Sequence, residues 1–208
     1  KIKYPESNEK PQFDNELSKE ILSYTGWNVF GASVGIFKFQ AVNIILNQFF
    51  SPIVITARSI ASQVNSAVLS FAQNFSTAVR PQIIKSYAQE KISEMNNLVF
   101  QSSKLTFYLM FIFVLPLYLE MPFVLKLWLK EIPEYAILFT QLALIDALID
   151  SISFPIMTAA QATGKIKLYQ AVVGGILLLN LPISFIFLIK GFYPQIVFYV
   201  AISLTFIA

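Results

Sequence analysis

The chain contains no cysteine and no histidine. These absences exclude disulfides, thiol nucleophiles, the usual zinc sites and histidine acid–base chemistry. Charged residues make up only 13% of the 208 residues, and hydrophobic residues make up 56%. A soluble domain of this length would have too few polar residues to cover so many apolar side chains. We therefore expect no catalytic residue, no metal site and no cofactor, and the expected solvent is a lipid bilayer.

The apolar residues fall into blocks of about 20, the length at which a helix crosses roughly 30 Å of hydrocarbon. The strands of a membrane β-barrel would instead show alternating apolar and polar residues. The sequence therefore predicts an all-α polytopic transmembrane bundle of about six spans. They are expected at residues 21–50, 53–78, 102–121, 135–159 and 166–189, with a sixth, truncated span at 194–208. Residues 1–20 predict a cytoplasmic loop with an amphipathic lead-in, and the charged segment at 122–135, PFVLKLWLKEIPEY, predicts an interfacial helix.

Positive charges are distributed unevenly between alternate ends of these spans. One side carries Lys1, Lys3, Lys10, Lys19, Arg80, Lys85, Lys91, Lys104, Lys165 and Lys167, and the other carries Lys126, Lys130 and Lys190. By the positive-inside rule, the first side is cytoplasmic. Lys38 and Arg58 belong to neither group because both fall inside expected spans.

The second expected span carries polar residues at three- and four-residue steps, which places them on one helical face. We call this set the polar stripe: Arg58, Ser62, Asn65, Ser66, Ser70, Gln73, Thr77 and Arg80. A lipid-facing stripe would leave these groups unsatisfied, so we expect it to face other helices or a water-filled cavity. The alternatives are hydrogen bonding between helices for any one polar residue and snorkelling to the outer interface for Arg58.

Two carboxylates are predicted inside the fourth span. Asp146 and Asp150 lie one helical turn apart on one face. Two charges there would repel each other in a low-dielectric bundle, so we expect one carboxyl to hold a proton and the pair to serve ion coupling. The alternatives are pairing with Lys38 or Arg58 and hydration in a vestibule. In the first span, Gly31 and Gly35 have the GxxxG spacing that allows close helix packing.

Two segments carry a family resemblance: TARSIASQVNSAVLSFAQNFSTAVRPQIIKSYA at Thr56–Ala88 and DALIDSISFPIMTAAQATGKIKLYQ at Asp146–Gln170. They resemble the multidrug/oligosaccharidyl-lipid/polysaccharide (MOP) exporter superfamily, and especially polysaccharide-biosynthesis flippases of the Bacteroidetes type. The resemblance implies two six-helix bundles around a central cavity, with about 12 to 14 spans in all. We expect this chain to be a fragment that supplies most of the second bundle.

The resemblance also implies a function, which is transport and not catalysis. Such flippases export a lipid-linked oligosaccharide, an undecaprenyl-pyrophosphate sugar, across the bacterial inner membrane by alternating access. Membrane lipids and H⁺ or Na⁺ are the other expected partners, and nucleic acid is not expected. A pyrophosphate requires fixed cations and hydrogen-bond donors, which Arg58, Lys38, Asn65 and Gln73 could supply.

Two other functions compete with export of a lipid-linked oligosaccharide. A cation-coupled multidrug antiporter of the MATE type would favour acidic cavity residues, so Asp146 and Asp150 support it, whereas Lys38 and Arg58 oppose it. The choice between these two transport functions depends on whether the acidic pair or the basic pair faces the cavity. A membrane-embedded polysaccharide polymerase or acyltransferase would require long extramembrane loops with clustered catalytic residues, and the sequence has none.

Overall fold

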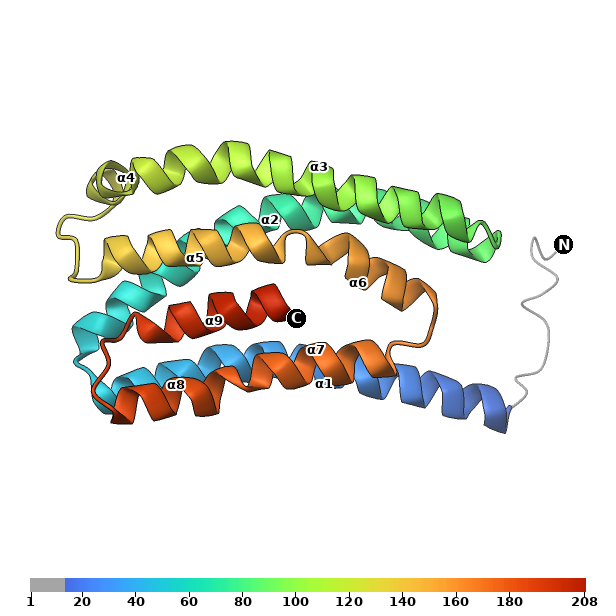
Figure 1. Cartoon of the computed structure of the whole chain (residues 1–208), viewed down its shortest axis with the longest axis horizontal. Helices are drawn as coiled ribbons and strands as arrows, with labels where there is room; N and C mark the ends of the chain where they lie inside the picture. The colour runs from blue at the N-terminus through green and yellow to red at the C-terminus, as the bar shows by residue number, and fades with distance from the viewer. Residues whose placement is uncertain (1–13) are drawn as a thin grey trace, which may run out of the picture.

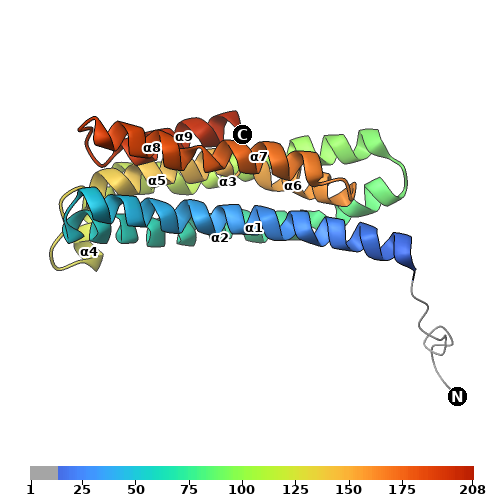
Figure 2. The ribbon, with the colours of Figure 1, turned by 90° about the horizontal axis from the view of Figure 1, so that it is seen from below.

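The computed structural model describes residues 14–208, apart from the side chains of Lys38, Phe39 and Ala41. Within this range the regular elements are α1 (Asn15–Phe49), α2 (Pro52–Ala88), α3 (Ile92–Leu119), α4 (Met121–Trp128), α5 (Ala136–Asp150), α6 (Ser153–Ala162), α7 (Lys167–Leu178), α8 (Asn180–Ile189) and α9 (Ile196–Ile207). The long helices lie side by side in one elongated bundle (Figures 1 and 2). The predicted all-α polytopic bundle is confirmed.

Four helical stretches of the described chain are long and apolar enough to cross a membrane: Asn15–Phe49, Ile92–Leu119, Ala136–Ala162 and Lys167–Ile189. They correspond to four of the six expected spans. The helix at the second expected span, α2, is long enough to cross, but the polar stripe lowers its hydropathy. The helix at the sixth expected span, α9, has only 12 residues, which is fewer than the roughly 20 that a membrane span requires.

Two helices begin earlier in the chain than the expected spans. The first, α1, begins at Asn15, where the carboxylate of Asp14 accepts hydrogen bonds from the N–H groups of Glu16 and Leu17 at 2.9 and 3.2 Å. The last part of the predicted lead-in is therefore the start of this helix, and residues 1–13 lie outside the described part. The third, α3, begins at Ile92, because the charged segment before residue 102 continues the helix.

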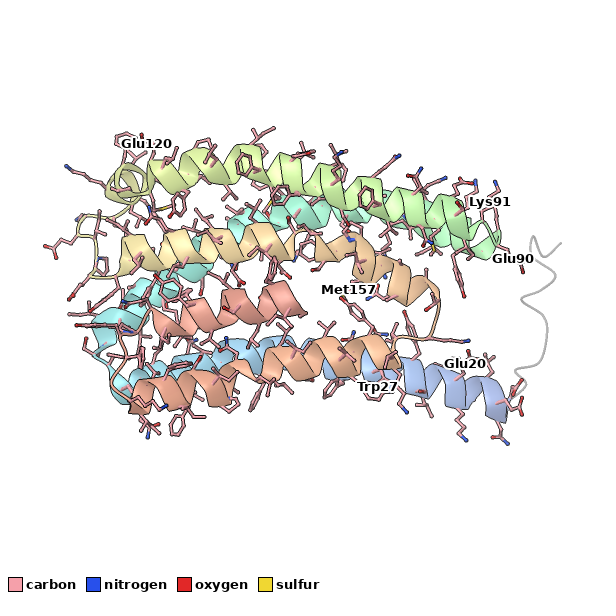
Figure 3. All side chains as sticks on the ribbon, in the orientation of Figure 1. Glu20, Trp27, Glu90, Lys91, Glu120 and Met157 are labelled. Atoms are coloured by element: carbon pink, nitrogen blue, oxygen red, sulfur yellow. The ribbon has the colours of Figure 1, made fainter. Side chains whose placement is uncertain are left out.

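Connections alternate between the two ends of the bundle (Figure 1). The α2–α3 turn and the α6–α7 loop lie toward one end, and α4 and the loops at residues 129–135 and 190–195 lie at the other. Glu90 and Lys91 mark the first end and Glu120 marks the second (Figure 3). Among the described cations, the first predicted group has members beside the connections at one end, and the second has members beside those at the other: Lys85, Lys91, Lys165 and Lys167 against Lys126, Lys130 and Lys190.

Prolines break two of the expected spans into paired helices. Pro155 has no N–H to bond the carbonyl four residues earlier, and α5 ends at Asp150 just before that carbonyl. Pro182 has the same effect between α7 and α8, where the second helix begins at Asn180. Both breaks fall near the middle of the bundle's length (Figure 1), so Asp150 at the end of α5 and Asn180 at the start of α8 lie far from either end of the bundle.

The main hydrophobic core lies where α2 packs against α5 and α3. The face of α2 in this core carries Ala57 and Ala61, both fully buried, and these small side chains allow close approach of the helices. On α5, Phe139 is fully buried and contacts the ring of Phe198 with centroids 4.7 Å apart. This packing fixes the rotation of α2 about its axis and determines which polar residues it turns inward.

The two glycines of the GxxxG spacing have different surroundings. A Cβ on Gly31 would overlap the side-chain amide of Gln170, which is buried between α1 and α7. A Cβ on Gly35 would meet nothing within 4 Å. A side chain at residue 31 would therefore displace the amide of Gln170, whereas Gly35 borders an open space.

We expect Gly31→Ala to raise the thermal unfolding temperature less than Gly35→Ala does. Both substitutions gain helix propensity, about 1 kcal/mol, but only the first must displace the amide of Gln170. In the background of Gln170→Ala the difference between the two glycine substitutions should disappear, and differential scanning fluorimetry measures it. An equal effect of both substitutions with Gln170 present would contradict the assigned contact.

Candidate functional site

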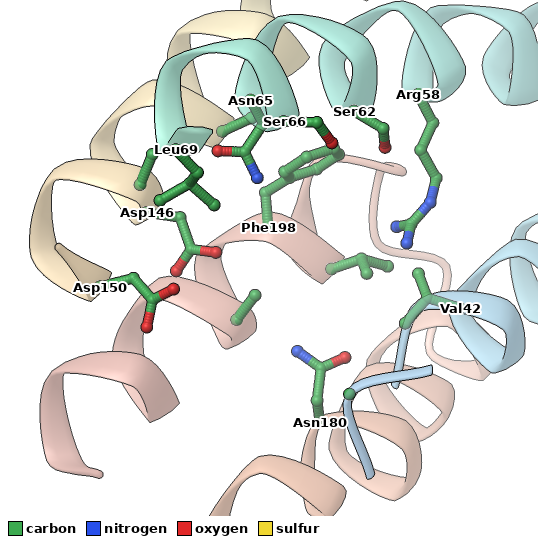
Figure 4. A pocket seen from close by; sticks show the side chains of 15 residues that line it. Val42, Arg58, Ser62, Asn65, Ser66, Leu69, Asp146, Asp150, Asn180 and Phe198 are labelled. Carbon is green, nitrogen blue, oxygen red and sulfur yellow. The ribbon is translucent and has the colours of Figure 1, made fainter. Parts of the chain in front are cut away.

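A cavity of about 250 Å³ lies inside the bundle between α1, α2, α5, α8 and α9 (Figure 4). We call it the central cavity. Its apolar lining comes mostly from small or branched side chains and includes Gly35, Val42 and Phe198. The polar residues that line it are Arg58, Ser62, Asn65, Ser66, Asp146, Asp150 and Asn180. A polar cavity therefore exists in the interior of a bundle whose outer surface is strongly apolar.

Arg58 is held inside the bundle. Its side chain is only 8% exposed, and its Nε donates a hydrogen bond of 2.6 Å to Asn43 Oδ1 on α1. The guanidinium carbon lies 5.9 Å from the centroid of the Phe198 ring, within range of a cation–π interaction. These contacts orient the guanidinium toward the central cavity and away from the outer interface.

The two carboxylates occupy the other end of the cavity. Figure 4 shows Asp146 and Asp150 projecting into it from α5, with Arg58 at the opposite end. Asp146 Oδ1 is buried and lacks a hydrogen-bond partner within the described part of the chain. The same holds for Asn65 Oδ1 and Asn180 Nδ2. Buried acceptors without a donor are costly, by about 1–3 kcal/mol each, so the Asp146 end of the cavity is suited to a proton, a water molecule or a small cation.

The polar stripe divides into two parts. Residues from Arg58 to Ser66 line the central cavity, whereas Ser70, Gln73 and Thr77 are exposed on the surface of α2. Arg80 is exposed and donates to Gln161 Oε1 at 3.0 Å, which ties α2 to α6. The structure therefore brings Arg58, Asn65, Asp146 and Asp150 together among the predicted site residues. It leaves Gln73 outside the cavity, and the side chain of Lys38 lies outside the described part.

Three residues of the site were not among the predicted ones: Asn43, Asn180 and Phe198. Asn43 belongs to a short polar series in α1, and its signal was the three-residue spacing to Gln40 and the four-residue spacing to Asn47. Asn180 is 1% exposed and is the only asparagine of its expected span, two residues before a proline. An isolated amide beside a helix break was therefore a usable signal. The role of Phe198 depends on tertiary packing and had no signal in the sequence.

Cysteine labelling tests which residues of α2 contact water. The chain has no native cysteine, so each substitution introduces the single thiol of this sequence, and only cysteines outside it need replacing. We expect Ser62→Cys, Asn65→Cys and Gln73→Cys to react with a water-soluble maleimide, the first two through the cavity and the third at the surface. Ile60→Cys and Val64→Cys, which pack in the main core, should be protected. Labelling of these two with protection of the first three would mean that α2 faces the opposite way.

One family comparison gives a match. The family model MatE matches residues 36–186, more than half of the chain, from the second part of α1 to α8. The matched region includes every polar residue of the central cavity. Neither the comparison with curated proteins nor that with solved structures gave a match.

Proposed function

Because the chain belongs to the MatE family of multi-pass membrane transporters, part of the MOP superfamily, we propose that it exports a lipid-linked oligosaccharide across the bacterial inner membrane. The substrate is an undecaprenyl-pyrophosphate sugar, and transport follows alternating access, in which two bundles move around a midplane site. The observation that carries this proposal is Arg58, a buried cation that borders the central cavity.

A buried arginine suits an anionic headgroup. Its planar guanidinium matches the oxygens of a phosphate in a forked geometry, and its charge is permanent. The bond from Nε to Asn43 and the ring of Phe198 hold it in place before substrate arrives, which reduces the entropy lost on binding. An organic cation would be repelled at the same position.

The size of the cavity indicates which part of the substrate it would take. At about 250 Å³ it is smaller than the roughly 300–1,000 Å³ of sites that enclose drug-sized ligands. We assign it to the pyrophosphate. The sugars would then lie along the exposed part of the polar stripe at Ser70, Gln73 and Thr77. The hydroxyls of Ser70 and Thr77 donate to carbonyls of their own helix at 2.6 and 2.8 Å, so their oxygens remain acceptors for sugar hydroxyls.

We assign Asp146 and Asp150 to coupling by H⁺ or Na⁺. Transporters of the MatE family use such ions. The unpartnered Oδ1 atoms of Asp146 and Asn65 in the same cavity are the kind of oxygen that a proton donor or a hard cation would satisfy. A pyrophosphate would be repelled there, which separates the coupling end of the cavity from the Arg58 end.

The same carboxylates favour a second candidate, a cation-coupled multidrug antiporter. Asp146 faces the cavity with an unpartnered acceptor, and a lipophilic cation could occupy that position. The two candidates differ in the sign of the charge that the site recognises, so ligand binding separates them.

Stabilisation of the protein by a bound ligand shows whether the site recognises an anion or a cation. In detergent, a short-chain prenyl pyrophosphate should raise the unfolding temperature of the full protein, with about 2.7 kcal/mol of stabilisation at a concentration 100 times Kd. Tetraphenylphosphonium should have no such effect. A prenyl alcohol of the same chain length controls for binding of the chain alone. Stabilisation by the organic cation and none by the pyrophosphate would favour the antiporter.

A further inference from the structure

A second hollow lies on the outer surface of the bundle, between α3 and α6. This groove has a volume of about 600 Å³, and its lining includes Phe100, Ser103, Lys104, Phe107, Ile152 and Ile156. The residues of its walls are mostly apolar. Three of these residues have well-exposed side chains: Phe100 at 72%, Tyr108 at 52% and Ile156 at 46%. On the membrane-facing side of a bundle, such a groove is filled by lipid.

The polar groups at the floor of the groove are already satisfied. Ser103 Oγ donates a hydrogen bond of 2.9 Å to the carbonyl of Ile152, which lies at the break between α5 and α6. The Ser103 hydroxyl therefore has its acceptor within the groove, and the apolar floor around it suits an acyl chain.

Lys104 is the charged residue of the groove and has an unusual depth. Residues 105–119 contain no charge, and this run spans about 22 Å of helix, less than the roughly 30 Å of hydrocarbon. Measured from Glu120, the next charged residue, the hydrocarbon therefore extends past Lys104 by about 8 Å, roughly one and a half helical turns. Within the described chain its ammonium has no carboxylate partner and lies 5.9 Å from the ring of Tyr108. A lysine at this depth is stabilised by an anion that reaches it from the membrane.

We propose that this groove binds one anionic phospholipid, with its phosphate at Lys104 and an acyl chain beside Phe107 and Ile152. The groove shares no lining residue with the central cavity, so the lipid is a bound membrane component and not the transported substrate. In the predicted orientation Lys104 lies toward the cytoplasmic side, where the leaflet carries a negative surface potential. The lipid would join α3 to α6 at the break that follows Asp150.

The test is quenching of a tryptophan in the groove by lipids with brominated acyl chains. The full protein carries Phe107→Trp, with Trp27, Trp128 and every tryptophan outside this sequence replaced by phenylalanine, and is placed in phosphatidylcholine vesicles. Brominated phosphatidylglycerol or brominated phosphatidylcholine is then titrated in. We expect phosphatidylglycerol to bind about fivefold more strongly than phosphatidylcholine, the ratio expected for one lysine near a membrane surface.

Matched variants identify the cause of the preference. Lys104→Gln should remove it, Lys104→Arg should keep it, and Lys126→Gln, at the other end of the bundle, should leave it unchanged. Ile112→Trp in place of Phe107→Trp reports on an exposed position of α3 outside the groove, and it should show no preference. Equal quenching by the two lipids at Phe107→Trp, or a preference that survives Lys104→Gln, would overturn the proposal.

Discussion

Arg58→Gln is expected to lower the rate of lipid-linked oligosaccharide export by about 10- to 150-fold, the factor for losing hydrogen bonds to a charged group. The glutamine keeps part of the side-chain length and can still donate to Asn43, but it lacks the charge and the fork that a pyrophosphate requires. Arg58→Lys keeps the charge without the fork and should retain part of the activity.

Export is measured as surface polysaccharide at equal protein levels, with Arg80→Gln as the matched control. Arg80 is on the same helix but exposed, and it is bonded to Gln161 and not to the cavity. Its substitution should leave export close to the wild-type rate. Equal output from wild type and Arg58→Gln would remove Arg58 from the site.

Asp146→Asn and Asp150→Asn are expected to flatten the dependence of transport on pH or sodium while leaving binding of the lipid-linked substrate largely intact. If one proton is coupled, the wild-type rate can change by about tenfold per pH unit, and this slope should approach zero in the double variant. Asparagine is nearly isosteric with aspartate, so the cavity should keep its shape.

The measurement is transport into proteoliposomes across a series of pH and sodium values, with substrate binding followed in parallel. Glu120→Gln, which removes an exposed carboxylate at the end of the bundle, is the control and should keep the wild-type profile. A double variant with an unchanged profile and a normal rate would show that the two carboxylates are structural or solvated. Export driven by the membrane potential, worth about 2.3 kcal/mol per charge per 100 mV, would then be the better explanation.

The sequence predicted those parts of the fold that depend on local pattern. Apolar blocks predicted where the helices lie, and the four-residue spacing of Asp146 and Asp150 correctly placed both on one face toward one space. The long extent of α3 was not predicted, because the charged segment before residue 102 was interpreted as an extension of the preceding helix plus a turn, and hydropathy does not show where that turn lies. The composition of a segment thus shows whether it lies in the membrane more clearly than it shows whether a charged segment outside the membrane is a helix or a loop.

The site was predicted only in part because it depends on contacts between distant segments. The polar stripe indicated one face of α2, but the packing of α5 against α2 and of α9 against α5 determines where the cavity ends along that face. Asn65 is therefore inside it and Gln73 is outside. Asn180 reaches the cavity from α8, 115 positions after Asn65 in the sequence (180 − 65), and no spacing rule connects two residues so far apart.

A reconstituted flipping assay tests the central claim most directly. The full protein is placed in proteoliposomes that contain a fluorescent undecaprenyl-pyrophosphate oligosaccharide, and movement between leaflets is read from loss of protection against a membrane-impermeant quencher. We predict movement with the wild-type protein, strong reduction with Arg58→Gln, and wild-type movement with Arg80→Gln. Absence of lipid movement in the wild type, together with ion-dependent uptake of an organic cation by the same vesicles, would contradict the account.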